Sequence, residues 1–387
     1  MKRFKLGSLI QKIDNNKNKE LKNLPLLGIN IDKEFMPSVA NVIGTDMSNY
    51  QIIRKWQFAC NPMHLGRDER MPTALLTDKD EILISPAYFA FEVIDKSMLL
   101  PEYLMLYFKR SETDRLLWFK TDSSVRGGLS WDEMCDIEIP VPEIEVQQKV
   151  INYYNKINNA ISVKEKLNNN LEQQAEFIFD VIFQEENDYN SLADVVHTTS
   201  GGTPSRNRHE YFQNGIIDWV KSKELTGHFV FSSEEKITEI AVSNSSTKLL
   251  PQYSVLLAMY GANVGEYGII TKPMTCNQAI CALIPNDKYP YTYIYCYIKT
   301  LKEKIKTLAV GSAQQNISQI IIKKLPIHSN LSKIAEFDSK TLKIFKYIEL
   351  NQKETFLLMK LRDTSLPKLM SGETEDVSSL NYHLVNQ

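Results

Sequence analysis

The sequence predicts an α+β protein in which two α/β domains are separated by two long antiparallel coiled-coil helices, related by a pseudo-twofold internal repeat. With 387 residues, the chain is too long for one ordinary hydrophobic core. It also repeats one series of segments about half a chain apart, and each copy ends in a long helical stretch. Its apolar content of 43% and charged content of 24% are ordinary for a folded globular protein.

The repeat is visible when the two halves are aligned, at offsets of about 184 to 190 residues. Between the repeated segments, roughly residues 25–95 and 200–285 look unrelated to one another. The corresponding segments are KLGSLI (5–10) and SLADVV (191–196), LLPEYLMLYFKR (99–110) and YPYTYIYCYIKT (289–300), RGGLSWDEM (126–134) and VGSAQQNIS (310–318), IEIPVP (137–142) and IKKLPI (322–327), and the helical stretches 143–183 and 329–366.

A duplicated frame that holds two different inserts suggests two modules that recognise two different things. The alternative is an old duplication that has drifted, but drift alone would erode frame and insert alike. The expected divisions are a first domain (1–142), a first spacer helix (143–188), a second domain (189–327), a second spacer helix (328–372) and a flexible acidic tail (373–387).

The two long stretches have apolar residues at coiled-coil spacing. Helices this long and narrow need a partner, so an antiparallel pair with free outer faces is the simplest packing, and two unrelated surface helices are the alternative. Polar residues in the shared seam would fix its register at a cost in stability. The predicted seam is Val150, Tyr154, Ile157, Ile161, Leu167, Leu171, Ala175, Ile178 and Ile182 in the first helix, and Ile334, Phe337, Thr341, Ile344, Ile348, Asn351, Thr355 and Leu358 in the second.

Both inserts mix short strand-like runs with turns, which predicts mixed α/β domains of about 140 residues each. The predicted strands lie in DEILIS (80–85) and YFAFEVI (88–94) of the first insert, and in GIIDWV (215–220), YSVLLAMYG (253–261) and AICALIP (279–285) of the second.

In the first insert, the loop CNPMHLGRDER (60–70) contains candidate contact residues for nucleic acid. Arginine binds phosphates, and arginine and asparagine also bind base edges. A solvated surface loop is the simpler explanation of this loop taken alone. Tyr50 and Tyr88 can stack on a base or pack in the core, and core packing is the more common role of a single aromatic residue. The candidates are Asn61, His64, Arg67, Arg70 and Tyr88.

The second insert opens with GGTPSRNRHEYFQNGIIDWVKSKEL (201–225) and contains two more glycine loops, YGANVGEYG (260–268) and GSAQQNIS (311–318). Backbone amides in glycine-rich turns bind phosphate oxygens, and Asn or Gln pairs with adenine. We expect Tyr211 and Trp219 to anchor the opening loop. The candidates here are Thr203, Ser205, Arg206, Arg208, Lys221, Lys223, Tyr260, Asn263, Gln314, Gln315 and Asn316.

Motifs for catalysis are absent from the sequence. It has no GxxxxGK[ST], nucleophile elbow, HExxH or DxDxDG, and the glycines of YGANVGEYG do not have dinucleotide-binding spacing. SPAY (85–88) lacks the second proline of the loop found in amino-methyltransferases. We therefore predict no catalytic residue, and an enzyme with a site assembled from distant segments stays the alternative.

Cysteine usage and charge restrict the setting of the protein. An odd number of cysteines without a CxxC favours buried, reduced thiols and no metal site. No apolar run could span a membrane and the N-terminus lacks a signal-peptide pattern, so we expect a cytoplasmic protein without a membrane partner. The net charge of −2 is unlike most DNA-binding proteins, so local patches or partner subunits would have to supply positive charge. The cysteines are Cys60, Cys135, Cys276, Cys281 and Cys296.

Several of these segments, in this order, resemble the specificity (S) subunit of type I restriction–modification systems over about residues 1–372. The resemblance rests on the 201–225 segment, on MYGANVGEYGI (259–269), VGSAQQNIS and IPVPEIEVQQKV (139–150), and on LRDTSLPKLMSGE near the C-terminus. The sequence departs from the family pattern in two places. The first half lacks a GGTPS segment, and KKLPIHSNLSKIAEF (323–337) is a degraded form of the proline-rich helix start.

The resemblance implies two target-recognition domains, each reading one half of a bipartite site in double-stranded DNA, with the helices setting the gap. It also implies two modification subunits, which bind S-adenosylmethionine and methylate adenine N6, and two restriction subunits that use ATP and Mg. The chain itself would hold no cofactor and catalyse nothing. One variant serves a simpler enzyme with fused methyltransferase and nuclease chains, and the alternative class is a coiled-coil scaffold with two globular heads and no DNA role.

Overall fold

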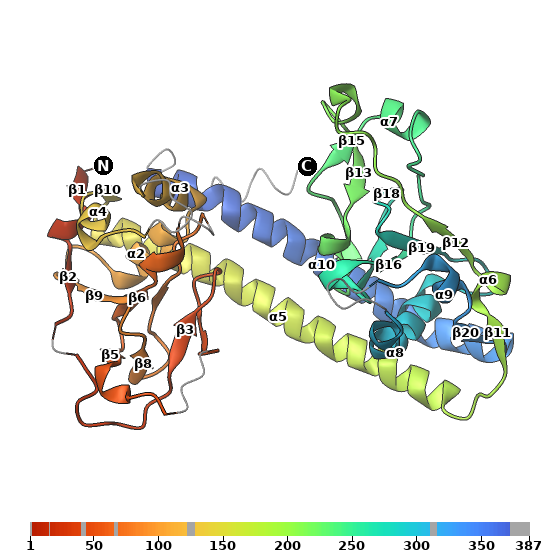
Figure 1. The fold of residues 1–387 in the computed structure, drawn as a ribbon, viewed down its shortest axis with the longest axis horizontal. Helices are drawn as coiled ribbons and strands as arrows, with labels where there is room; N and C mark the ends of the chain where they lie inside the picture. Colours follow the sequence, from red (N-terminus) through yellow and green to blue (C-terminus); the bar gives the residue numbers. More distant parts are fainter. Residues whose placement is uncertain are drawn as a thin grey trace. The chain divides into compact units, whose positions relative to one another are not determined.

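The computed structural model describes residues 2–14, 16–39, 44–65, 69–121, 128–309 and 316–371. The chain forms two compact units (Figure 1). Unit 1 comprises Met1–Asn159 and Met359–Gln387, and unit 2 comprises Ala160–Leu358. Two helices, α5 (Ile144–Phe183) and α10 (Leu331–Ser371), each run from one unit into the other. The tail predicted at 373–387 lies outside the described residues.

In unit 1, the strand that opens the chain pairs with the strand that precedes the long helix. β1 (Lys2–Lys5) is antiparallel to β10 (Glu138–Val141). The buried residue Leu6 then donates its backbone N–H to the carbonyl of Ile137 at 2.8 Å. The short helix α4 (Trp131–Cys135) begins at Ser130, whose hydroxyl accepts a hydrogen bond from a backbone N–H of the first turn.

Unit 2 repeats this arrangement with different residues. β11 (Tyr189–Ser191) is antiparallel to β20 (Pro326–His328), and Leu192 donates its N–H to the carbonyl of Leu325 at 2.9 Å. The short helix α9 (Gln319–Lys323) again begins at a serine, Ser318, whose hydroxyl accepts from a backbone N–H of the first turn. The repeat predicted from the sequence is therefore a repeat of hydrogen-bonded structure. We call these strand pairs and short helices, with the long helix that follows each, the frame.

The two central sheets have the same strand order, although the inserts look unrelated in sequence. The order is β2-β9-β6-β7 in unit 1 and β12-β19-β16-β17-β14 in unit 2, and the first four strands of each pair in antiparallel fashion. The expectation of unrelated middles is thus wrong for this sheet, because backbone hydrogen bonds build a sheet and many combinations of apolar side chains fill its buried face. The strands are β2 (Ile10–Lys12), β6 (Phe58–Cys60), β7 (Thr73–Leu75) and β9 (Phe89–Val93), and β12 (His197–Ser200), β14 (Phe229–Val230), β16 (Val255–Ala258), β17 (Tyr267–Ile270) and β19 (Ile280–Ile284).

Outside these sheets the inserts differ. Unit 1 adds two strand pairs, β3 (Leu27–Ile29) with β4 (Phe35–Pro37) and β5 (Gln51–Arg54) with β8 (Glu81–Ile84). Unit 2 instead adds a separate three-stranded sheet in the order β15 (Lys236–Ile237), β13 (Ile217–Val220), β18 (Thr275–Cys276). All five predicted strand segments are confirmed as β8, β9, β13, β16 and β19.

The remaining elements are helices outside the frame as defined above. The α-helices are α2 (Pro101–Phe108), α3 (Ser111–Lys120), α6 (Leu192–Val195), α7 (Glu239–Ser243) and α8 (Tyr291–Leu308). The 3-10 helices are η1 (Leu6–Ser8), η2 (Met47–Asn49), η3 (Pro62–His64), η4 (His209–Tyr211), η5 (Ser222–Glu224) and η6 (Gly261–Asn263). Among the described residues, no helix is both long and apolar enough to cross a membrane.

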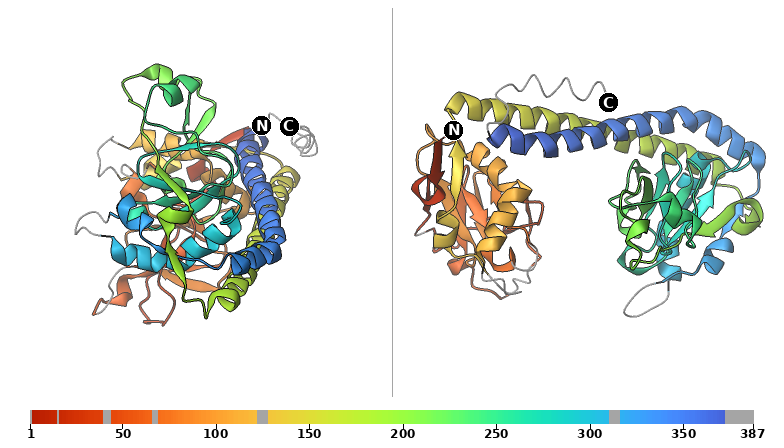
Figure 2. Two further views of the ribbon diagram at one scale, coloured as in Figure 1. Left: turned by 90° about the vertical axis from the view of Figure 1, so that its right-hand side faces the viewer. Right: turned by 90° about the horizontal axis from the view of Figure 1, so that it is seen from above.

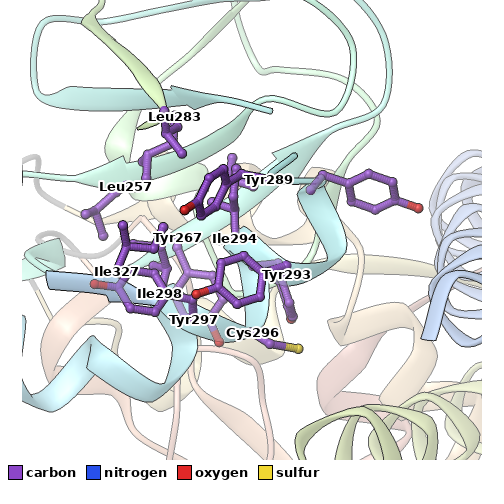
Figure 3. Packing of buried hydrophobic residues seen from close by; sticks show 14 of the residues in the cluster. Leu257, Tyr267, Leu283, Tyr289, Tyr293, Ile294, Cys296, Tyr297, Ile298 and Ile327 are labelled. Atoms are coloured by element: carbon purple, nitrogen blue, oxygen red, sulfur yellow. The ribbon is translucent and has the colours of Figure 1, made fainter. Parts of the chain in front are cut away.

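Each unit has its own aromatic core. In unit 1, the rings of Phe58 and Phe91 stack with centroids 4.8 Å apart. In unit 2, the first half of α8 is buried on all sides and is rich in tyrosine (Figure 3). The hydroxyl of Tyr293 lies 2.9 Å from Nδ1 of His328, so this polar atom is satisfied inside the core. Of the five free cysteines, all but Cys135 are buried, as expected for reduced thiols.

The two long helices pack antiparallel in both units, as predicted. In unit 2, Lys164 pairs with Glu354 and Asn168 pairs with Asn351. Residue numbers that increase along α5 thus face residue numbers that decrease along α10. Both views in Figure 2 show α10 lying along α5 there. In unit 1, Arg362 donates a hydrogen bond to the side chain of Asn158, 3.1 Å away.

The seam differs from the predicted one at particular positions. Leu167 is 48% exposed and its neighbour Asn168 is buried, because the side-chain amide of Asn351 donates a hydrogen bond to Oδ1 of Asn168 at 3.1 Å. In α10 the fully packed residue is Phe345, whereas Ile344 is only partly buried. The polar seam residues Thr341 and Thr355 are buried as predicted, and the Thr341 hydroxyl donates to the carbonyl of Phe337.

Helix α10 ends at Ser371, inside the predicted spacer division 328–372, and contains Pro367. Proline removes one backbone hydrogen bond and usually costs about 3 kcal/mol in a helix interior. Here the residues that follow it, Leu369 and Met370, are buried in the core of unit 1 with Val150 of α5. Their burial offsets the missing bond and holds the final turn.

Candidate nucleic-acid interface

The two glycines that open the second insert are required by close backbone packing. A Cβ on Gly201 would lie 2.2 Å from the carbonyl oxygen of Cys276, and one on Gly202 would lie 2.5 Å from the Ser246 backbone. The carbonyl of Gly202 accepts a hydrogen bond from the indole Nε1 of Trp219 at 3.0 Å. Trp219 and Tyr211 are both buried, so the prediction that they anchor this loop is confirmed.

Arg206 lies on the aromatic surface that this anchor provides. Its guanidinium carbon is 4.5 Å from the ring centroid of Phe212 and 5.2 Å from that of Trp219. Its Nη1 is 2.6 Å from Oε2 of Glu235. The side chain is nevertheless 55% exposed, so one face of the guanidinium is open to solvent. Stacking and a carboxylate together fix its direction.

Lys221 bonds to the other oxygen of the same carboxylate. Hydrogen bonds from Arg206 and Lys221 lower the pKa of Glu235 to about 2. Three residues that are distant in sequence therefore form one charged group, which we call the Arg206 cluster (Arg206, Lys221 and Glu235). The structure brings two predicted contact residues together here, and the exposed Thr203 and Ser205 lie in the same loop.

The other two predicted cations of this region also have carboxylate partners. Nζ of Lys223 lies 2.6 Å from Oε2 of Glu234, and this pair raises the pKa of the lysine. Arg208 lies over the ring of Tyr211, and its Nη1 is 3.9 Å from Glu210. Each of the four cations that were predicted to contact DNA in the second insert is thus paired with a carboxylate of the same chain.

Sequence reasoning missed the acidic residues of this surface. The segment SSEE (232–235) was not singled out, although it contains both carboxylates described above. Asp218 of β13, which is almost fully buried, holds this segment by accepting hydrogen bonds from Ser232 and Ser233. Burial alone would raise the pKa of Asp218, but bonds from Lys272 and these serines outweigh it and lower the pKa. The available signal was an acidic pair directly before a strand, which is a common surface feature and hence uninformative alone.

Tyr260, Asn263 and Asn316 lie on other elements of unit 2. Tyr260 and Asn316 form an isolated antiparallel bridge, and Asn263 ends η6. Gly261 and Gly265, on either side of Asn263, have φ of +76° and +84°, a left-handed conformation that glycine adopts freely. The structure thus brings Tyr260 next to Asn316. Gln314 and Gln315 lie outside the described residues.

In unit 1, the structure brings two of the predicted residues together. The Asn61 side chain accepts from the backbone N–H of Met63 and caps η3. Tyr88 is half-buried, and burial raises its pKa although a hydrogen bond with Asn61 opposes the shift. Arg70 is instead near the turn between β3 and β4, where its Nη1 lies 3.8 Å from Oδ1 of Asp32. Arg67 and the side chain of His64 lie outside the described residues.

A buried ion pair supports this part of unit 1. Nζ of Lys33 is 2.7 Å from Oδ1 of Asp114, and their side chains are only 5% and 10% exposed. The same carboxylate accepts the backbone N–H of Met71, and the lysine also donates to the carbonyl of Phe108. Burial lowers the pKa of Lys33, and Asp114 opposes this. The pair joins the β3–β4 turn, the end of the 60–70 loop and α3, and no local sequence pattern predicts it.

Comparisons with known proteins agree with this architecture. Residues 184–356 match the family model "Type I restriction modification DNA specificity domain". The MjaIX type I restriction enzyme specificity subunit of Methanocaldococcus jannaschii is 27% identical over 314 residues, which cover 73% of this chain and 71% of that protein. The EcoR124I/EcoR124II specificity subunit of Escherichia coli is 36% identical over 113 residues, 28% of each chain. The crystal structure of the S subunit from M. genitalium has the same fold, with a TM-score of 0.53 at 14% identity over 95% of this chain and 96% of that one.

Proposed function

We propose that the chain is a specificity subunit of a type I restriction–modification system and that it reads a bipartite DNA site, one half with each insert. It is a non-catalytic subunit whose matched region is a DNA recognition domain. The proposal concerns how recognition is divided. Each central sheet would carry one set of contact loops, and α5 and α10 would set the gap between the half-sites.

The observation that carries this proposal is the contrast between frame and insert. The frame repeats down to single hydrogen bonds, Leu6 to Ile137 and Leu192 to Leu325. The strands added around the two sheets differ, with two strand pairs in unit 1 and a separate three-stranded sheet in unit 2. Base-edge contacts depend on individual side chains, so two domains of one fold with different loops suit two different sequences. A scaffold without a DNA role would have no need of two different heads.

The outer face of α5 supports docking of partner subunits. Apolar side chains that are exposed at helical spacing mark protein contact surfaces. We propose that two modification subunits bind along α5 and α10, and that two restriction subunits join them. S-adenosylmethionine, ATP and Mg would belong to those partners, and this chain would hold no cofactor. The exposed apolar residues of α5 that share one face are Val163, Leu167, Phe177 and Val181.

A genome-wide map of N6-methyladenine, in source cells with and without this gene, tests the proposal. We expect the deletion to remove methylation at a single two-part motif with a fixed gap. An unchanged map, with the partner methyltransferase expressed and active, would contradict it. Loss of methylation at an unbroken motif would contradict the division of recognition between two domains.

A further inference from the structure

Three predicted contact cations of the second insert are already paired with carboxylates. Arg206 and Lys221 share the Glu235 carboxylate, and Lys223 is paired with Glu234. DNA phosphates would have to compete with these carboxylates for the same N–H donors.

The backbone that carries both glutamates is held in place by hydrogen bonds. The carbonyl of Glu235 accepts from the N–H of Trp219 at 3.1 Å and from the Ser233 hydroxyl at 2.5 Å. The carboxylate of Glu224 receives the N–H of Glu234 and the N–H of Lys221, each at 2.7 Å. This carboxylate therefore ties the acidic segment to the strand end that carries the lysines, so the ion pairs are built into the loop.

A carboxylate at a fixed position beside a cation opposes non-specific DNA binding. Such binding comes almost entirely from lysine and arginine releasing counterions from phosphates, and each neutralised phosphate changes the slope of log K against log salt by about −0.9. A tethered carboxylate already neutralises the cation and repels the phosphate that would replace it. It therefore removes phosphate contacts from complexes that have no base-specific contacts to compensate.

A carboxylate opposes DNA binding less when the duplex contains the target sequence. An ionised carboxylate is a hydrogen-bond acceptor only, and in the major groove it can accept from the amino group of cytosine. The Glu235 carboxylate is 33% exposed, so one side of it can meet such a donor. Where the bases offer donors, base contacts offset the repulsion, and elsewhere they do not.

We propose that Glu234 and Glu235 are specificity-determining residues that occupy Lys223, Lys221 and Arg206 as tethered counter-anions and so suppress binding to non-target duplex DNA. This inference rests on the proposed function, because it assumes that the second insert faces DNA. It goes further by assigning the discrimination to carboxylates and not to cations alone.

The test uses the assembled complex of this chain with its modification subunits. Its affinity is measured for a duplex with the target motif and for one with the motif scrambled, at several salt concentrations. We expect Glu235→Gln to raise affinity for the scrambled duplex by about threefold to tenfold, and to steepen the salt slope by about one phosphate or more. Affinity for the target should change less, so that the ratio of the two falls.

Two further variants test whether disturbed folding or the change in net charge explains the result. Glu234→Gln removes an exposed partner of Lys223, whose side chain is itself 56% exposed, so the fold does not depend on it. Glu234→Gln should change the affinity for the scrambled duplex in the same direction as Glu235→Gln does. Asp136→Asn is the matched control, because it removes one exposed carboxylate from an ion pair with Lys5 in unit 1, outside the proposed contact loops and docking helices. It changes the net charge equally and should leave both affinities unchanged.

The outcomes separate this inference from the proposed function. If wild type prefers the target but both glutamine variants bind scrambled DNA no better than Asp136→Asn does, the counter-anion role is wrong while DNA reading stands. If Asp136→Asn raises affinity as much as the others, overall charge is responsible and the proposal is again wrong. If the wild-type complex shows no preference for any duplex, it is the proposed function that fails.

Discussion

The two inserts use ion pairs in opposite ways. In unit 1, Lys33 and Asp114 are buried and join three segments of one core. In unit 2, Arg206 and Glu235 lie at the surface, on a loop that is already anchored by Trp219. A buried pair contributes chiefly to holding structure, whereas an exposed pair contributes little to stability and remains available to a ligand. The same sheet therefore supports one domain whose charges stabilise it and another whose charges face outward.

The largest expected effect comes from breaking the buried pair in unit 1. Lys33→Ala leaves the Asp114 carboxylate buried without its cation, which typically costs about 3–5 kcal/mol. We expect a large fall in the urea midpoint of unit 1, measured by hydrogen exchange of its core amides. Lys5→Ala removes an exposed pair with Asp136 in the same unit and should change the midpoint little. Equal effects of the two substitutions would show that burial of the pair is irrelevant.

A somewhat smaller effect is expected at the glycines of unit 2. Gly201→Ala places a methyl group 2.2 Å from a carbonyl oxygen of the neighbouring strand end, so the backbone must shift. Overpacking of this kind costs about 1–3 kcal/mol. Thermal unfolding checks this, with Gly128→Ala as control, because the nearest atom to a Cβ there is 3.5 Å away. A wild-type melting temperature for Gly201→Ala would contradict the packing explanation of these glycines.

Removing an exposed cation should affect binding and not folding. Arg206→Ala should weaken DNA binding by the assembled complex by about fivefold and reduce the salt slope by about one phosphate. Arg67→Ala, a prediction from sequence alone, should act in the same direction. Unfolding should be nearly unchanged for Arg206→Ala, since its ion pair is exposed. Unchanged affinity and salt dependence for both would remove these two residues from the interface.

The smallest effect expected is that of pH on the Arg206 cluster. Because the pKa of Glu235 is lowered to about 2 from an ordinary value of 4.5, its contribution is complete above the ordinary value and is lost as pH falls through 2. The indole N–H resonance of Trp219 should therefore keep its position as pH falls from 7 to about 3.5. A titration of this resonance with a midpoint near 4.5 would mean that the ion pairs do not form in solution.

Local pattern was sufficient to predict the frame and not the surface. Spacing of apolar residues predicts both long helices, and strand-like runs predict the sheet strands, because these signals repeat within a few residues. The spacing predicted that Leu167 would be buried in the seam, but Asn168 is buried there instead. This could not be predicted locally, because it depends on a hydrogen bond with Asn351 in the other helix. The partners of Lys33 and Arg206 are distant in sequence as well. Pairing of distant residues is set by tertiary packing, so a list of cations could be predicted while the carboxylates that hold them could not.

The central claim is that each insert reads its own half of the target, and one exchange tests it directly. The second insert, residues 200–285, is replaced by the corresponding segment of a relative with a different known target, and N6-methyladenine is mapped across the genome. The account predicts a hybrid motif in which one half-site changes while the other half and the gap are retained. A change in both half-sites or in the gap, from a hybrid complex with active methyltransferase, would contradict it.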